Sequence, residues 1–180
     1  MIILIGGSSH VGKTLLAQKL LEELKYPYIS LDHLKMGFIR NNMTSLTVEN
    51  DYEMRYFLWP YASEIIKTAV ENKQNLILEG CYIPKEWKES FTEEYLCEIK
   101  AMFLVMSEEY LRNNFDSVCA QASVIESRID DEPDLERLIA CSREFKQIAA
   151  YSDSCCIEIN EKYDIDDILK QAVSIVGKAK

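Results

Sequence analysis

The sequence predicts an α/β fold in which a parallel β-sheet is buried between layers of helices. Five short apolar runs recur along the chain, at 2–5, 28–31, 76–78, 101–106 and 155–159. Most of these runs are continuous rather than alternating, which is typical of strands buried on both faces. Segments with the apolar spacing of helices lie between them, and strand–helix alternation indicates parallel strands joined by right-handed crossovers.

Length and composition predict a single domain over residues 1–180. The chain is 48% hydrophobic and 28% charged, without a Pro/Gly/Ser-rich linker. Its formal charge of -10 argues against a nucleic-acid or anionic-membrane partner, because such partners need a basic surface. Met1 leads directly into an apolar run, and no uncharged run approaches the roughly 20 residues of a membrane span. We therefore expect a cytoplasmic protein.

The cysteines do not have the spacing of a metal site. The six cysteines form no C-x-x-C pair, and the chain has only two histidines. A domain of this size has an ample core, so we expect reduced thiols and no structural zinc.

The first apolar run leads into a glycine-rich motif, G-x-x-x-x-G-K-T. Gly7 and Gly12 permit the backbone conformations that bring N–H groups to phosphate oxygens. Lys13 supplies charge at the β- and γ-phosphates, and Thr14 a hydroxyl for Mg²⁺. A helix predicted to begin near Lys13 directs its positive end at the same anion. The motif therefore predicts a P-loop that binds ATP or GTP, made of Gly7, Ser8, Ser9, His10, Val11, Gly12, Lys13 and Thr14.

An acid follows each of the next two runs. Asp32 comes after 28–31, and Glu79 comes after 76–78. In a parallel sheet both carboxylates lie at the edge that carries the P-loop. We expect Asp32 to act as general base on a substrate hydroxyl and Glu79 to hold Mg²⁺ or its waters. The alternatives are that Asp32 caps a helix through 33–35 and that Glu79 is an ordinary loop acid.

The long segment 33–72 is predicted to hold more than one helix and to bind the phosphoryl acceptor. Arg40 and Arg55 are candidate acceptor contacts. Five aromatic residues can line the acceptor pocket by stacking, although their spacing favours packing in the core. They are Tyr52, Tyr56, Phe57, Trp59 and Tyr61.

The segment 108–150 is predicted to form a lid and the helix that follows it. Ser107 is a plausible N-cap, Asp134 opens a helix reaching about Tyr151, and Asp164 caps the last helix. No lysine occurs from 101 to 145, yet four of the six arginines do: Arg112, Arg128, Arg137 and Arg143. A guanidinium suits bidentate phosphate contacts, and the alternative is pairing with nearby acids.

Three tracts carry a family resemblance: residues 7–14, Leu31-Asp32-His33, and 76–84, which reads LILEGCYIP. They resemble the successive motifs of small P-loop kinases, which include adenylate, shikimate and gluconate kinases, chloramphenicol phosphotransferase and zeta toxins. The resemblance implies a five-stranded parallel sheet of order 2-3-1-4-5, with helices on both faces. It also implies a substrate segment after the second strand and an arginine-bearing helical lid after the fourth. Arg112 and Arg143 best fit the catalytic lid positions, with Arg128 as a further nucleotide contact.

Two features compare the chain with particular members of that group: one is a similarity, and the other is a partial difference. Gly6-Gly7-Ser8-Ser9 with Asp32 is most similar to chloramphenicol phosphotransferase and zeta-like kinases, in which an acid there serves as base toward a hydroxyl. Glu79-Gly80 resembles the Asp-Gly pair of nucleoside monophosphate kinases, but the arginine that follows in those kinases is replaced by Lys85 after an insertion. Arg40 can take the role of that arginine.

The sequence therefore predicts an ATP- and Mg²⁺-dependent kinase that transfers the γ-phosphoryl group to a hydroxyl of a small molecule. One alternative is a nucleoside monophosphate kinase. Another is a regulatory ATPase or GTP-dependent switch. The string Asn72-Lys73-Gln74-Asn75 lacks the aspartate of the guanine-specific Asn-Lys-x-Asp motif, which weighs against a GTPase.

Overall fold

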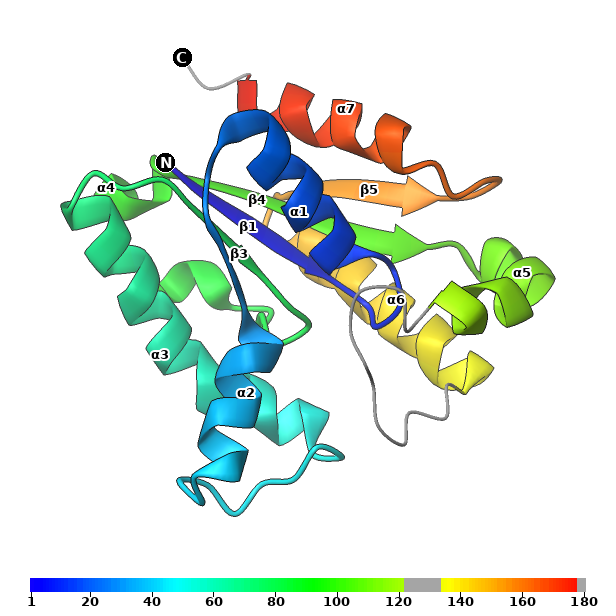
Figure 1. The fold of residues 1–180 in the computed structure, drawn as a ribbon, viewed down its shortest axis with the longest axis horizontal. Coiled ribbons are helices and arrows are strands. Elements are labelled where there is room, and N and C mark those ends of the chain that lie inside the picture. Colours follow the sequence, from blue (N-terminus) through cyan, green and yellow to red (C-terminus); the bar gives the residue numbers. More distant parts are fainter. Residues whose placement is uncertain (122–133, 178–180) are drawn as a thin grey trace.

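A five-stranded sheet forms the centre of the molecule (Figure 1). The computed structural model describes residues 1–121 and 134–177. The strands are β1 Ile2–Gly7, β2 Tyr28–Ser30, β3 Leu76–Glu79, β4 Ile99–Met106 and β5 Cys155–Ile159. They are parallel and lie in the order β2-β3-β1-β4-β5. The predicted fold class and strand order are confirmed.

Helices cover both faces of the sheet. They are α1 Lys13–Leu24, α2 Leu31–Arg40, α3 Asp51–Glu71, α4 Glu93–Leu96, α5 Glu108–Gln121, α6 Leu135–Tyr151 and α7 Ile165–Gly177, with a 3-10 helix η1 at Trp87–Ser90. Figure 1 shows α1 and α7 on one side of the sheet and α3 and α6 on the other. No helix in the described ranges is long and apolar enough to cross a membrane.

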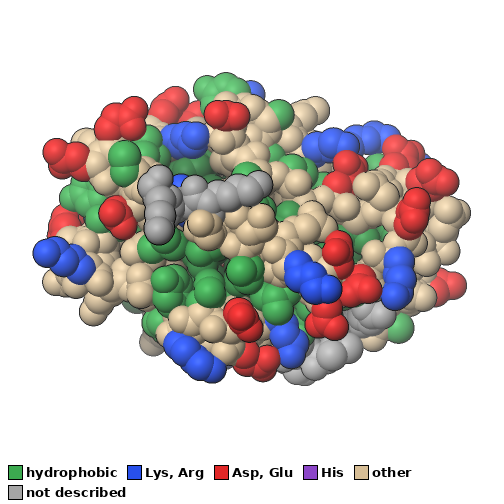
Figure 2. Space-filling model, turned by 90° about the horizontal axis from the view of Figure 1, so that it is seen from above, with side chains coloured by type: hydrophobic (Ala, Val, Ile, Leu, Met, Phe, Trp, Pro, Cys, Tyr) green, Lys and Arg blue, Asp and Glu red, His purple; other side chains and the backbone are tan. Residues whose placement is uncertain are grey.

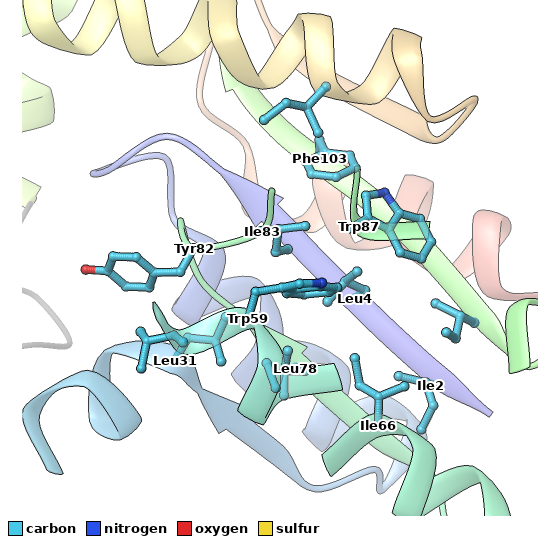
Figure 3. Packing of buried hydrophobic residues seen from close by; sticks show 14 of the residues in the cluster. Ile2, Leu4, Leu31, Trp59, Ile66, Leu78, Tyr82, Ile83, Trp87 and Phe103 are labelled. Carbon is cyan, nitrogen blue, oxygen red and sulfur yellow. The ribbon is translucent and has the colours of Figure 1, made fainter. Parts of the chain in front are cut away.

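The continuous apolar character of β1 follows from its position between two cores. Side chains alternate along a strand, so Ile2 and Leu4 pack on the α3 side while Ile3 and Ile5 pack on the α1 side. Figure 3 shows the first of these clusters, with Leu4 beside Trp59 and Ile83. All six residues of β1 are buried, which gives the P-loop a rigid base.

The strand bounds differ from the prediction at four ends. β1 extends to Gly7 because Gly6 and Gly7 pair with β4, and β4 correspondingly begins at Ile99. β2 ends at Ser30 and α2 begins at once at Leu31, whereas β3 continues to Glu79. The segment between β3 and β4 also contains η1 and α4, which had no apolar periodicity long enough to predict them.

The two long crossovers hold more than one helix each, as predicted: α2 and α3 in the first, and α5 and α6 in the described part of the second. The three predicted caps are also present. The backbone N–H of Tyr110 donates to Ser107 Oγ at 3.1 Å, and that of Arg137 donates to Asp134 Oδ1 at 2.7 Å. The backbone N–H of Asp167 donates to Asp164 Oδ1 at 3.2 Å.

The aromatic residues of α3 are divided between core and surface. Trp59 is 6% exposed and packs in the core, as favoured from its spacing. The same expectation is wrong for Tyr52, Tyr56 and Tyr61, which are 63%, 46% and 46% exposed. These tyrosines lie away from the helix face on which Met54 and Leu58 are buried.

Candidate active site

The P-loop connects the end of β1 to the first turn of α1. Gly12 has a φ of 89°, in the left-handed region that favours glycine. A Cβ at Gly12 would also overlap the hydroxyl of Tyr163, from the loop between β5 and α7. Gly7 lies against the backbone of Leu104 in β4, where a Cβ would overlap its carbonyl. Both glycines are therefore required by local geometry.

Lys13 lies inside the loop. Its side chain is 6% exposed, and its Nζ donates to the backbone carbonyl of Ser8 at 2.8 Å. Because Lys13 is also the first residue of α1, its ammonium lies near the positive end of the helix dipole. Two sources of positive charge thus meet at one anion-binding turn.

Thr14 and Glu79 bring two oxygen ligands together beside the loop. Thr14 Oγ1 donates to Glu79 Oε1 at 3.2 Å, and Glu79 is completely buried at the end of β3. Ser30 lies opposite Glu79 in the strand register, and its buried Oγ has no hydrogen-bond partner among the described residues. A hydroxyl, a carboxylate and an unsatisfied buried hydroxyl are a donor set that fits Mg²⁺ and its waters.

Mg²⁺ needs few protein ligands when phosphates supply the others. The described residues contain no group of three or more His, Cys, Asp or Glu side chains that could hold a metal. Thr14 and Glu79 are therefore suited to a metal that arrives with a nucleotide, rather than to a closed structural site.

Asp32 is the second residue of α2, at the same end of the sheet as Glu79. The N-cap of this helix is Ser30, so Asp32 occupies the first helical turn instead of capping it. Its side chain is 28% exposed and forms an ion pair with Lys35, with Nζ 3.1 Å from Oδ1. Tyr82 Oη donates to Asp32 Oδ1 at 3.2 Å. These contacts fix the orientation of the carboxylate.

Lys35, Asp51 and Tyr82 lie beside Asp32 and were not predicted, and Arg137 was predicted only as one of the lid arginines. Tyr82 Oη lies 3.3 Å from Asp51 Oδ1 and accepts from Lys35 Nζ. Arg137 Nη2 donates to Asp51 Oδ2 at 2.8 Å. They belong to α2, α3, the loop after β3, and α6, so their meeting depends on tertiary structure. The sequence offered one signal for this polar group, because Tyr82 lies only three residues after the predicted site residue Glu79.

Tyr82 joins this polar group to the core. Its side chain is 1% exposed, and Figure 3 shows its ring beside the buried cluster with the hydroxyl oxygen pointing away from it. Burial raises the pKa of Tyr82, and the nearby Cys81 and the carboxylates of Asp32 and Asp51 raise it further. The phenol therefore stays protonated and can donate.

The predicted arginines lie in different surroundings. Arg55 is buried, forms an ion pair with Glu144 and lies over the ring of Phe145, while Arg40 is the exposed last residue of α2. Arg112 and Arg143 both bind the carboxylate of Glu108, and Arg112 also binds Glu136 at 2.8 Å. Arg128 lies outside the described residues.

Helix α6 contacts both the P-loop and α3. Ser142 Oγ donates to Ser8 Oγ at 3.1 Å in a buried contact, and Glu144 binds Arg55 of α3. Arg137, at the start of the same helix, binds Asp51. The sequence predicted this helix but gave no sign that it connects the two halves of the site.

A separate apolar groove lies at the opposite end of the sheet, between α2 and α3. Its volume is about 1150 Å³, and its lining includes Pro27 and Leu76, at the starts of β2 and β3. Figure 2 shows a patch of hydrophobic side chains on one face of the molecule, with charged side chains around it. Asp32 and Glu79 lie at the other ends of these strands and do not line the groove, although Leu34 of α2 does.

Comparisons with known proteins support the fold but not a specific activity. No protein-family model matches the chain, and no curated protein matches its sequence. Among solved structures, a deoxyadenosine kinase from M. mycoides has a TM-score of 0.60 at 12% identity, covering 98% of this chain and 99% of its own. A gluconokinase from Sinorhizobium meliloti has 0.57 at 12%, covering 98% and 91%. A shikimate kinase from Aquifex aeolicus has 0.56 at 16%, covering 99% and 98%.

Proposed function

We propose that this chain, which has the fold of small P-loop kinases over nearly its whole length, is an ATP- and Mg²⁺-dependent kinase of a small-molecule hydroxyl. The observation that carries the proposal is the contact of Thr14 with the buried Glu79, one strand away from Asp32. A P-loop alone indicates phosphate binding. A metal-binding pair and a separate oriented carboxylate beside it are the parts that phosphoryl transfer requires.

In the proposed reaction, the acceptor oxygen forms a bond to the γ-phosphorus of ATP. The bond from that phosphorus to the β,γ-bridging oxygen breaks, and ADP leaves with the electron pair. Asp32 takes the proton of the acceptor hydroxyl. The P-loop amides and Lys13 hold the phosphates, while Thr14 and Glu79 hold Mg²⁺ or its waters. Bound Mg²⁺ supplies positive charge to the β- and γ-phosphate oxygens.

We keep Arg112 and Arg143 as candidates for neutralising charge on the transferred group, with Arg128 as a further nucleotide contact. Because Arg112 and Arg143 both bind Glu108, each must exchange this carboxylate for phosphate oxygens. Exposed ion pairs are weak enough for such an exchange. Arg40 and Arg55 remain candidates for the acceptor side, within the segment 33–72.

The test measures ADP release with ATP and Mg²⁺ against a panel of monophosphates, nucleosides, sugars and chloramphenicol- or aminoglycoside-like alcohols. We expect at least one hydroxyl-bearing compound to raise the rate above that without an acceptor. A monophosphate as the sole substrate would favour the nucleoside monophosphate kinase instead. Release that stays at background with every compound would favour the regulatory ATPase.

Lys13→Ala tests the nucleotide half independently of the acceptor. Ligand at 100 times its Kd stabilises a folded protein by about 2.7 kcal/mol, so ATP should raise the Tm of the parent protein. We expect this shift to vanish in Lys13→Ala, because the variant loses the ammonium at the phosphates. The control is Lys19→Ala, which removes a lysine on the outside of the same helix. An unchanged ATP affinity of Lys13→Ala in calorimetry would refute the assignment.

A further inference from the structure

The hydroxyl of Tyr82 lies between two carboxylates. Its oxygen is 3.2 Å from Asp32 Oδ1 and 3.3 Å from Asp51 Oδ1, so the two acids lie close together. They come from α2 and α3, the two helices that make up most of the segment predicted to bind the acceptor. Their side chains are 28% and 44% exposed, which leaves both accessible to a ligand.

The phenol has only one proton to share. It can donate to Asp32 or to Asp51 at any moment but not to both, while it accepts from Lys35. A hydroxyl group on a ligand supplies the second proton, and its oxygen can then accept from a neighbouring donor. The side chains of Asp32, Lys35, Asp51 and Tyr82 therefore fit a ligand hydroxyl, which can donate and accept a hydrogen bond at the same time.

The positive charges in this group are already matched by negative ones. Lys35, with an 11% exposed side chain, is paired with Asp32 at 3.1 Å. Arg137 is paired with Asp51 at 2.8 Å. Two cations and two carboxylates leave no net charge among these residues. A carboxylate or phosphate on the ligand would have to displace an acid from its cation and then remain beside that acid.

We propose that Asp32, Lys35, Asp51 and Tyr82 form the acceptor subsite, and that this subsite selects an uncharged, hydroxyl-rich molecule over an anionic one. The inference rests on the proposed kinase function and specifies its substrate class. Asp32 takes the proton of the reacting hydroxyl. Asp51 accepts from a second hydroxyl, and Tyr82 and Lys35 hold the two carboxylates in place.

The experiment compares matched pairs of acceptors, each a sugar or polyol and its carboxylate or phosphate derivative. The pairs include glucose with glucuronate, ribose with ribose 5-phosphate, and glycerol with glycerate. We expect an uncharged member to be phosphorylated, with a kcat/KM at least about tenfold above that of its anionic partner. The repulsion between two like charges 4 Å apart near a protein surface exceeds the free-energy difference that a tenfold ratio of kcat/KM requires.

The outcomes separate the two proposals. Phosphorylation of anionic members with equal or higher kcat/KM would overturn the inference and leave the kinase function intact. ADP release at background with every pair, while ATP still raises the Tm, would overturn both.

Substitutions test the named residues directly. Asp51→Asn leaves Lys35 and Arg137 with one carboxylate between them, so we expect it to raise the relative kcat/KM of the anionic member by about tenfold. Asp166→Asn, an exposed acid on α7, is the control and should leave the ratio unchanged. An Asp51→Asn variant with the parent ratio would remove Asp51 from the subsite.

Tyr82→Phe removes one hydroxyl and keeps the buried ring. We expect kcat/KM for the uncharged acceptor to fall by about tenfold, the effect of one lost hydrogen bond, with the ATP-dependent rise in Tm retained. Tyr151→Phe, an exposed tyrosine on α6, is the matched control. A Tyr82→Phe variant with parental kcat/KM would show that the phenol only packs in the core.

Discussion

At the scale of single residues, Lys13 is held by the carbonyl of Ser8, a neutral acceptor. Phosphate binding therefore replaces one hydrogen bond of the ammonium without breaking an ion pair. Lys35 differs, because its ammonium is paired with Asp32 and bound to Tyr82. The two lysines at this end of the sheet thus suit different tasks: one is available for an anion, and the other fixes a carboxylate.

Asp32→Asn removes the proposed base while keeping the shape of the side chain. We expect kcat to fall by roughly 10²–10⁴, because an amide does not take up the acceptor proton. The ATP-dependent rise in Tm should persist, since the P-loop is unchanged. The measurement is ADP release at saturating acceptor, beside a melting curve with ATP. Turnover at the parental rate would reduce Asp32 to a residue of the first turn of α2.

The Cys81 thiol, which follows Glu79-Gly80, should be the slowest of the cysteines to react. Burial, together with the nearby carboxylate of Asp32, raises its pKa to about 12. At pH 8 the reactive thiolate is therefore scarce. We expect iodoacetamide to label the exposed Cys97 and Cys155 well before Cys81, as read by peptide mass spectrometry. Early labelling of Cys81 in the folded protein would contradict the burial described here.

At the scale of elements, α6 forms two ion pairs of different burial, one with α3 and one with α5. Arg55 has an 8% exposed side chain and binds Glu144 through Nη1 and Nη2, the latter at 3.3 Å. Arg112 has a 45% exposed side chain and binds Glu136 at 2.8 Å. Both glutamates are on α6, so an ion pair to a buried arginine can be compared with one to an exposed arginine on the same helix.

Glu144→Ala should destabilise the fold by about 3 kcal/mol, because it leaves the Arg55 guanidinium buried without its counter-charge. Glu136→Ala should cost no more than about 0.5 kcal/mol, since its partner is largely solvated. The measurement is the free energy of unfolding in urea for both variants and the parent. Equal losses for the two substitutions would show that burial does not set the strength of these pairs.

The elements that sequence patterns predicted are those with strong local signals. Continuous apolar runs identified the five strands, and Ser107, Asp134 and Asp164 marked three helix starts. The P-loop was readable because its chemistry is contiguous in sequence. The polar group around Tyr82 was not, because α2, α3, α6 and the loop after β3 each contribute to it. Side chains from distant elements leave no common spacing in the sequence.

At the scale of the whole molecule, the proposed reaction site and the apolar groove both involve β2, β3 and α2, but through different residues. The residues around Asp32 and Glu79 follow the ends of β2 and β3, whereas the groove is lined by Pro27 and Leu76 at their starts. The P-loop, Asp32 and Glu79 are not among the residues that line the groove.

This separation predicts the behaviour of an apolar dye. We expect anilinonaphthalene sulfonate to fluoresce on binding the groove, and saturating ATP to leave the signal unchanged. Tyr61→Glu, which places a charge on the groove lining, should lower the fluorescence, whereas Tyr151→Glu on α6 should not. Competition between ATP and the dye would mean that the dye binds near the P-loop instead.

The central place of β1 also has a consequence for the synthesis of the chain. β1 leaves the ribosome before its neighbours β3 and β4, which follow about 70 and about 100 residues later. At roughly 5–20 residues per second, the nascent chain carries an unpaired Ile2–Gly7 segment for several seconds. The strand that supports the P-loop in the finished protein is thus the segment most in need of chaperone protection during translation.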